Sequence, residues 1–137
     1  MRNKLFFYAL AVLLVYSCSK DDQPVDDPRD AILGKWQLTH LGNGIDAPPY
    51  EGDPGYQEYL PDSVMRIHND GEDGFIYQKY WFNDSLLLQS ATYVDAIDKD
   101  TIVYIERYKY EFLGRNRLKL DWQVNAIFTT SIYKRIK

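Results

Sequence analysis

The sequence predicts an all-β fold, a small up-and-down antiparallel β-barrel. Aromatic residues make up 15% of the 137 residues, and ten of the twelve tyrosines follow residue 18, which is typical of β-rich globular domains. Apolar and polar residues alternate with a period of two in most segments after residue 34, as in strands with one buried side. Short turns join these segments and no long amphipathic helix is visible, so we expect consecutive hairpins.

A β-barrel and a β-sandwich both fit such a meander. A sheet without a covering helix hides its edges best by closing on itself. We therefore predict the barrel and keep the sandwich as the alternative.

Residues 1–17 have the features of a signal peptide. Two basic residues, Arg2 and Lys4, precede an unbroken apolar run from Leu5 to Tyr16. The run is too short for a helix that spans a bilayer, which needs about 20 residues, but it fits the hydrophobic region of a secretion signal. It ends in Val15-Tyr16-Ser17-Cys18, which resembles the lipobox of bacterial lipoproteins.

Cys18 is the only cysteine of the chain, so it cannot form an internal disulfide. The lipobox resemblance implies that Cys18 is the first mature residue and that its thiol takes a diacylglyceryl group. Two or more acyl chains, such as palmitate, give stable membrane anchoring. Ser19 beside the cysteine favours the outer membrane, again by resemblance. The alternative is an ordinary signal peptide with an incidental cysteine.

Residues 18–31 carry the lipidated cysteine and an acidic, proline-broken segment without an apolar face. We expect a flexible linker here. The acidic residues resemble an export signal that sends lipoproteins to the cell surface in some Gram-negative lineages, or they only solvate a linker in the periplasm. The segment Arg29–Leu33 can form one short helical turn, and we place the barrel domain at residues 32–137.

The first strand includes residues 34–41 and places Trp36, Leu38 and His40 on one face. Residues 42–62 follow as a long loop rich in glycine and proline, and loops of this length are usually functional lids or mobile segments. The other strands are expected at residues 63–68, 75–82, 85–93, 101–113, 118–123 and 126–136, which makes about seven strands in all.

The first strand also carries a family resemblance. Gly34-Lys35-Trp36 resembles the G-x-W signature of lipocalins, and the layout of residues 30–137 is similar to the small lipocalin-like domains of bacterial lipoproteins. The resemblance implies that Trp36 plugs the closed end of the barrel, that an arginine of a late strand lies across it, and that residues 42–62 form a lid. Arg135 matches this arginine by position. An eighth strand and the C-terminal helix of lipocalins are not visible.

Aromatic residues are candidates for a ligand pocket inside the barrel. An eight-stranded barrel holds either side chains or one small ligand. The candidate residues either line such a pocket or simply form the core, since aromatic residues dominate burial. They are Trp36, Tyr104, Tyr108, Tyr110 and Trp122.

Glu106 has the same parity as Tyr104 and Tyr108. In a regular strand its carboxylate would point inward, which is costly without a partner and would suit recognition of a polar ligand group. A β-bulge near Arg107 would instead swap the faces and leave Glu106 in solvent. We favour the bulge.

No motif indicates catalysis, so we expect no enzyme activity, no cofactor and no metal. His40 and His68 lack the spaced partners of metal sites, and residues 69–74 do not match a calcium loop and should form a hairpin turn. The sequence contains neither a G-x-S-x-G nucleophile motif nor a glycine-rich phosphate loop.

The charge of the chain excludes one class of partner. The formal net charge is −4 and no nucleic-acid-binding motif accompanies the basic residues, so we expect no nucleic acid partner. The sequence indicates a lipid-anchored outer-membrane protein, on the periplasmic or cell-surface face, whose barrel binds a small apolar or aromatic ligand. The alternative is a protein-interaction module, an accessory subunit or inhibitor, that acts through the tyrosine-containing loop 42–62.

Overall fold

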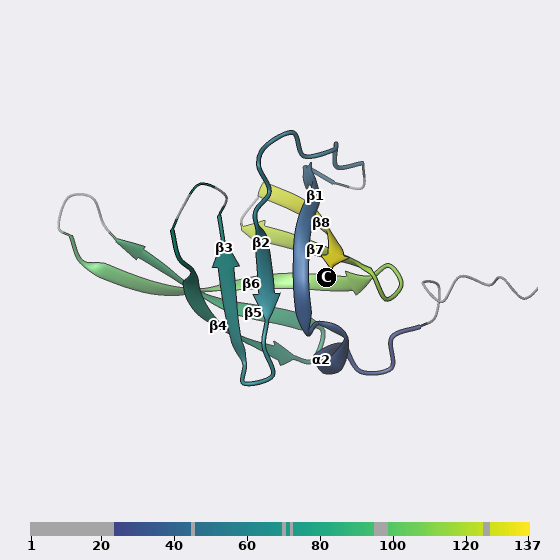
Figure 1. Cartoon of the computed structure of the whole chain (residues 1–137), viewed down its shortest axis with the longest axis horizontal. Coiled ribbons are helices and arrows are strands. Elements are labelled where there is room, and N and C mark those ends of the chain that lie inside the picture. Colours follow the sequence, from purple (N-terminus) through teal and green to yellow (C-terminus); the bar gives the residue numbers. More distant parts are fainter. Residues whose placement is uncertain (1–23, 45, 70, 72, 95–98, 125–126) are drawn as a thin grey trace, which may run out of the picture.

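Eight antiparallel strands close into one barrel in the computed structural model, each strand pairing with its neighbours in sequence and β1 with β8 (Figure 1). The structure describes residues 24–44, 46–69, 71, 73–94, 99–124 and 127–137. The predicted signal peptide, Cys18 and linker residues 19–23 lie outside the described residues. One helical turn, α2 (Pro28–Ala31), precedes the strands β1 (Gly34–Gly42), β2 (Tyr56–Tyr59), β3 (Val64–His68), β4 (Ile76–Asn83), β5 (Leu86–Val94), β6 (Thr101–Phe112), β7 (Arg117–Val124) and β8 (Ile127–Ile136).

The prediction of an up-and-down β-barrel is confirmed, but the expected number of strands is wrong. The additional strand is β2, inside the segment 42–62 that the sequence predicts as a loop. β2 pairs with both β1 and β3. It is four residues long, and its buried positions are Gln57 and Tyr59, so a polar side chain interrupts the hydrophobic pattern. The connection between β1 and β2 is therefore limited to residues 43–55.

A β-bulge lies in β1. The register between β1 and β8 shifts between Leu38 and His40, which leaves Thr39 as the extra residue. Leu38 pairs with Tyr133, which lines the barrel interior, whereas His40 pairs with the next residue along β8, Ile132. The prediction that His40 shares the face of Leu38 is wrong for this reason.

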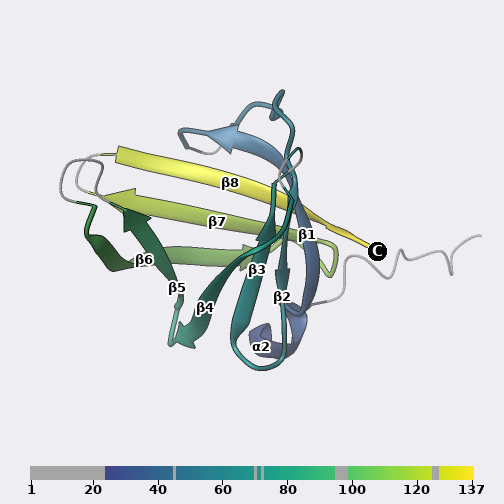
Figure 2. The same cartoon turned by 60° about the vertical axis from the view of Figure 1, so that its left-hand side comes forward.

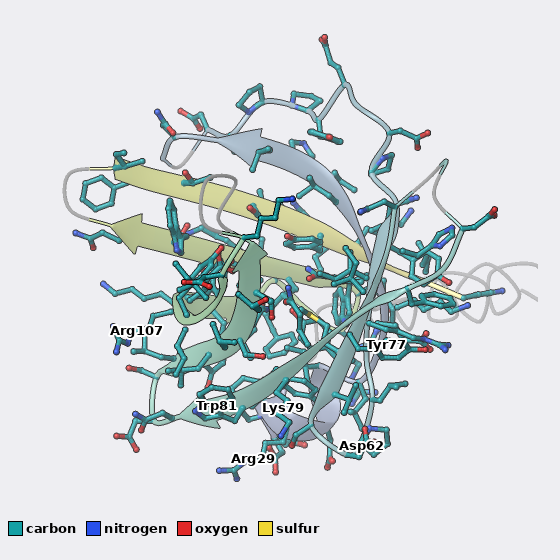
Figure 3. The ribbon with its side chains drawn as sticks, turned by 90° about the vertical axis from the view of Figure 1, so that its left-hand side faces the viewer. Arg29, Asp62, Tyr77, Lys79, Trp81 and Arg107 are labelled. Atoms are coloured by element: carbon teal, nitrogen blue, oxygen red, sulfur yellow. The ribbon has the colours of Figure 1, made fainter. Side chains whose placement is uncertain are left out.

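β6, by contrast, is regular over its length. It pairs with β5 without a register shift from Thr101 to Lys109, so the predicted bulge near Arg107 is wrong. Arg107 points away from the barrel (Figure 3), and its neighbour Glu106 lines the interior.

The barrel has a closed and an open end (Figure 2). α2 lies at the closed end with the turns that join β2 to β3, β4 to β5 and β6 to β7, and the connection from β1 to β2 lies at the other end. The buried core residues are all near the closed end of their strands. They are Ile32, Trp36, Tyr59, Met65, Tyr80, Leu87, Leu118 and Leu120. The open half of the barrel is left with little apolar filling.

β5 and β6 continue past the barrel as a two-stranded ribbon, at the left of Figure 1. β5 pairs with β4 only as far as Gln89, and β6 pairs with β7 only from Tyr108 onward. The two strands pair with each other as far as Val94 and Thr101. The exposed large apolar side chains of this ribbon are Ile102, Val103, Tyr104 and Ile105.

Candidate ligand-binding site

The closed end is sealed by Trp36 and Arg135, which the sequence suggested as a pair. The indole of Trp36 is fully buried, and its Nε1 donates a hydrogen bond of 2.6 Å to the carbonyl oxygen of Ile32. The guanidinium carbon of Arg135 lies 4.3 Å from the indole ring centroid, within the range of a cation–π contact. The two residues are direct partners in the β1–β8 register, so closing the barrel brings them together.

Arg135 also fastens the helical turn to the barrel. Its two Nη atoms donate to the carbonyl oxygens of Leu33 and Ala31, and its Nε donates to that of Arg115 at 3.1 Å. A helix leaves its last carbonyl groups without intrahelical partners, and the guanidinium supplies the missing donors. Burial lowers the pKa of Arg135, but an arginine remains charged in proteins.

Gly34 makes room for this arginine. Its φ of +111° lies in a region that residues with a Cβ rarely adopt, and a Cβ at this position would be 3.0 Å from Nη1 of Arg135. The glycine of the G-x-W sequence is therefore required both by its backbone conformation and by the guanidinium beside it.

Above Trp36 the barrel has a cavity of about 350 Å³ that is open to solvent on one side. Trp36 and Leu120 line it toward the closed end, and Thr92 and Tyr104 line it toward the projecting ribbon. Its volume is at the lower end of the range for small-molecule sites. Its polar lining residues are Gln57, Gln78, Gln89, Glu106, Tyr108 and Tyr133.

Hydrogen bonds organise part of this polar lining. The hydroxyl of Tyr108 donates to a carboxylate oxygen of Glu106 at 2.6 Å, and Nε2 of Gln89 donates to the hydroxyl of Tyr59 at 2.7 Å. Burial raises the pKa of Tyr108 far above its ordinary value, and the bond to Glu106 raises it further. Burial also raises the pKa of Tyr59 and of Tyr133. These phenols stay protonated at neutral pH and can donate hydrogen bonds.

Two polar groups of the lining keep unused hydrogen-bonding capacity. The side chain of Gln57 is only 9% exposed and lies beside Tyr133, yet its Nε2 has no partner in hydrogen-bonding geometry among the described residues. Glu106 accepts the bond from Tyr108 but forms no ion pair with any residue that the structure describes. A buried donor without a partner, such as Gln57 Nε2, is costly, and the partly buried Glu106 keeps free acceptor positions, so both positions are suited to a bound molecule or water.

The structure brings together only some of the predicted ligand residues. Trp36, Tyr104, Glu106 and Tyr108 line the cavity. Tyr110 does not, because its ring packs against Phe82 and Phe112 in the core, with centroid distances of 5.0 and 6.1 Å.

Trp122 lies elsewhere. It lines a separate groove of about 370 Å³, which it shares with outward residues of β6 and β7 such as Arg107 and Lys119. Its register position opposite Tyr108 does not place it in the cavity lining.

Sequence reasoning missed most of the polar lining. Gln57 and Tyr56 belong to the unrecognised β2, and Tyr133 to the last strand, where no special pattern marks it. Gln89 carried a usable signal, because it shares its parity with Leu87 and Ala91 in a strand whose other inward positions are apolar. A glutamine at an inward position of a small barrel indicates a polar cavity.

The described histidines and acidic residues do not gather into a metal site. The His68 ring lies between those of Tyr56 and Phe75, at centroid distances of 5.1 and 5.4 Å, and His40 is displaced by the bulge. Among the described residues, no group of three or more histidine, cysteine, aspartate or glutamate side chains could hold a metal ion. In the same part of the chain, no helix has the length and apolar character needed to cross a membrane.

The candidate site thus consists of the cavity and of the closed end that Trp36 and Arg135 seal. No family model matches this sequence, and no match is found among curated proteins or solved structures.

Proposed function

We propose that this chain is a lipid-anchored lipoprotein of the bacterial outer membrane, and that its lipocalin-like barrel binds a small, partly aromatic molecule. The observation that carries the proposal is the cavity of about 350 Å³ above Trp36. A ligand there would contact aromatic side chains, whose burial supplies most of the affinity in such sites.

The distribution of the core supports a ligand rather than a filled interior. The buried apolar cluster lies toward the closed end, while amides, phenols and one carboxylate line the cavity together with a few apolar side chains such as Ile67 and Ala91. Interiors are normally packed to the density of organic crystals. A cavity with polar groups such as Gln57 Nε2 left unpaired is stabilised by a molecule that fills it and satisfies them.

The proposed anchor fits the orientation of the barrel. The described chain enters at the closed end through α2, so a tether from Cys18 would attach at that end. The ten residues from Cys18 to Asp27 can span at most roughly 35 Å. The mouth of the cavity would then point away from the membrane.

Native mass spectrometry of residues 19–137, secreted into a bacterial periplasm, tests ligand binding. We expect an extra mass that denaturation releases. Ala91 lines the cavity and is buried, so Ala91→Phe should abolish the extra mass by filling the space. Val103→Phe, which adds the same ring at an exposed position of the ribbon, should leave it unchanged. A bare mass in the unsubstituted chain, with no shift on addition of lipids or aromatic compounds, would contradict the proposal.

The anchor has its own test. Cells that express the full chain should incorporate labelled palmitate into it, and Cys18→Ala should incorporate none, because the thiol is the group that takes the diacylglyceryl chains. Ser17→Ala keeps a small residue before the cysteine and should still be labelled. Equal labelling of the Cys18→Ala chain would rule out lipidation at this residue.

A second candidate function is contact with a partner protein through residues 43–55, the part of the predicted loop 42–62 that does not form β2. Two backbone hydrogen bonds hold this connection against β1, from Leu41 N to Pro48 O at 3.1 Å and from Tyr50 N to Thr39 O at 2.9 Å. A held loop with an exposed tyrosine loses little entropy on binding.

A photo-crosslinking amino acid in place of Tyr50 tests this second function. It should capture one defined protein in cells, while the same amino acid in place of Tyr77, on the outer face of β4 (Figure 3), should not.

A further inference from the structure

Glu106 is the only charged side chain among the described residues that line the cavity. The cations nearest to it in sequence, Arg107 and Lys109, lie on the opposite face of β6, and Arg107 points away from the barrel in Figure 3. Arg135, which is partly buried, is held at the closed end by Trp36 and three carbonyl groups. No described cation is therefore placed to neutralise the Glu106 carboxylate.

The hydrogen bond from Tyr108 satisfies only part of the carboxylate. An ionised carboxylate offers about four acceptor positions, and the Tyr108 hydroxyl occupies one of them. The Glu106 side chain is only partly buried, so its free acceptor positions can face a ligand in the cavity. A positively charged group bound there would pair with the carboxylate.

The surrounding residues indicate which kind of cation fits. Tyr104, Tyr108 and Tyr133 line the same cavity as Glu106, whereas the Tyr56 ring packs against His68 and Phe75. Organic ammonium groups bind well to a carboxylate combined with aromatic faces, since the ring quadrupole attracts the cation. Small metal ions prefer several oxygen ligands, and no described group of acidic or histidine side chains here could hold one.

The remaining lining residues describe the rest of the ligand. Trp36, Leu38 and Leu120 present apolar surface toward the closed end, which suits an apolar or aromatic body. The unpartnered Nε2 of Gln57 is a donor for one acceptor atom on the ligand. The volume of about 350 Å³ is sufficient for a compact molecule of this type.

We infer that the barrel recognises small aromatic or aliphatic amines in their protonated form, with Glu106 as the residue that binds the ammonium group. This inference rests on the proposed ligand-binding function. It narrows the ligand from any small aromatic molecule to one that carries a positive charge.

Isothermal titration calorimetry of residues 19–137 tests the charge with three probes of nearly equal shape. Tryptamine carries an ammonium group, tryptophol a neutral hydroxyl, and indole-3-propionate a carboxylate. Tryptophol and indole-3-propionate both lack the charge-assisted hydrogen bond from an ammonium group to Glu106. We therefore expect tryptamine to bind about tenfold or more tightly than tryptophol, and indole-3-propionate to bind most weakly. This comparison needs no substitution, so it does not depend on a variant that folds.

Glu106→Gln removes the charge but keeps an oxygen that can accept the Tyr108 hydrogen bond. It should weaken tryptamine binding by about tenfold while leaving tryptophol binding nearly unchanged. Glu111→Gln is the matched control. Glu111 is on β6 like Glu106, but its carboxylate lies outside the cavity and faces Lys119 of β7. A thermal melt of each variant shows whether it is folded.

The outcomes separate this inference from the proposed function. Equal or tighter binding of tryptophol or indole-3-propionate would overturn the preference for amines but would support a binding barrel. Absence of binding by all three probes, with a releasable cargo in the native mass spectrum, would overturn the amine inference and leave the proposed function standing. Absence of both would overturn the two together.

Discussion

At the scale of single residues, the closed end depends on Gly34. Its positive φ and the nearness of the Arg135 guanidinium are two separate constraints. In the sequence, Gly34 is marked only by the G-x-W signature. The structure shows that the group beside it is the arginine that covers Trp36.

Gly34→Ala should therefore destabilise the barrel by about 2–4 kcal/mol, which combines backbone strain with displacement of Arg135. Urea unfolding monitored by tryptophan fluorescence measures this loss. Gly44→Ala is the control, because Gly44 also has a positive φ but has open space around its Cβ position. If both substitutions cost the same, the contact with Arg135 contributes nothing.

Glu106 illustrates the limit of prediction at this scale. Its parity with Tyr104 and Tyr108 was visible in the sequence, and the inward position that parity implies is where the side chain lies. The expected bulge was invoked to avoid a buried charge. The structure avoids a fully buried charge differently, by giving the carboxylate a hydrogen bond from Tyr108 and a cavity to face.

At the scale of elements, long strands with clear alternation were predictable and the short one was not. β6 and β7 are close to their expected bounds because aromatic and aliphatic residues alternate with charged ones. β2 was missed because four residues give only two inward positions, and one of them is Gln57. The bulge at Thr39 has no signature in the sequence, since it arises from how β8 meets β1.

The projecting ribbon should be the least protected part of the sheet. Residues 101–105 of β6 pair only with β5, whereas Tyr108 and Lys109 pair with both β5 and β7. Hydrogen–deuterium exchange read by mass spectrometry should show amides of residues 101–105 exchanging about tenfold or more faster than those of Tyr108 and Lys109. Equal protection in the purified protein would indicate that a second chain covers the ribbon.

At the scale of the whole molecule, the buried phenols link stability to pH. Tyr59, Tyr108 and Tyr133 have pKa values raised by burial. Below pH 10 these groups are protonated in both the folded and the unfolded chain. Above it the unfolded chain loses their protons first, so the folded state binds more protons and stability must fall as pH rises.

We therefore expect the free energy of unfolding to decrease steadily above about pH 10. Tyr108→Phe removes one of the responsible groups and should make this decrease less steep, although the variant also loses the bond to Glu106. Urea titrations between neutral and alkaline pH provide the slope. Ultraviolet absorbance of tyrosinate supplies an independent check. If all ten tyrosines after residue 18 ionised together near their ordinary pKa in the folded protein, the explanation would be wrong.

The pairing of β1 with β8 has a consequence for the order of events when the chain folds. Trp36 and Arg135 meet only after nearly the whole sequence is available, and contacts between distant residues form slowly because a long loop must close first. A chain emerging from the ribosome cannot complete the barrel until its last strand, Ile127–Ile136, has been made. Such late closure would suit the proposed export, because a chain has to be unfolded to pass through a narrow secretion channel.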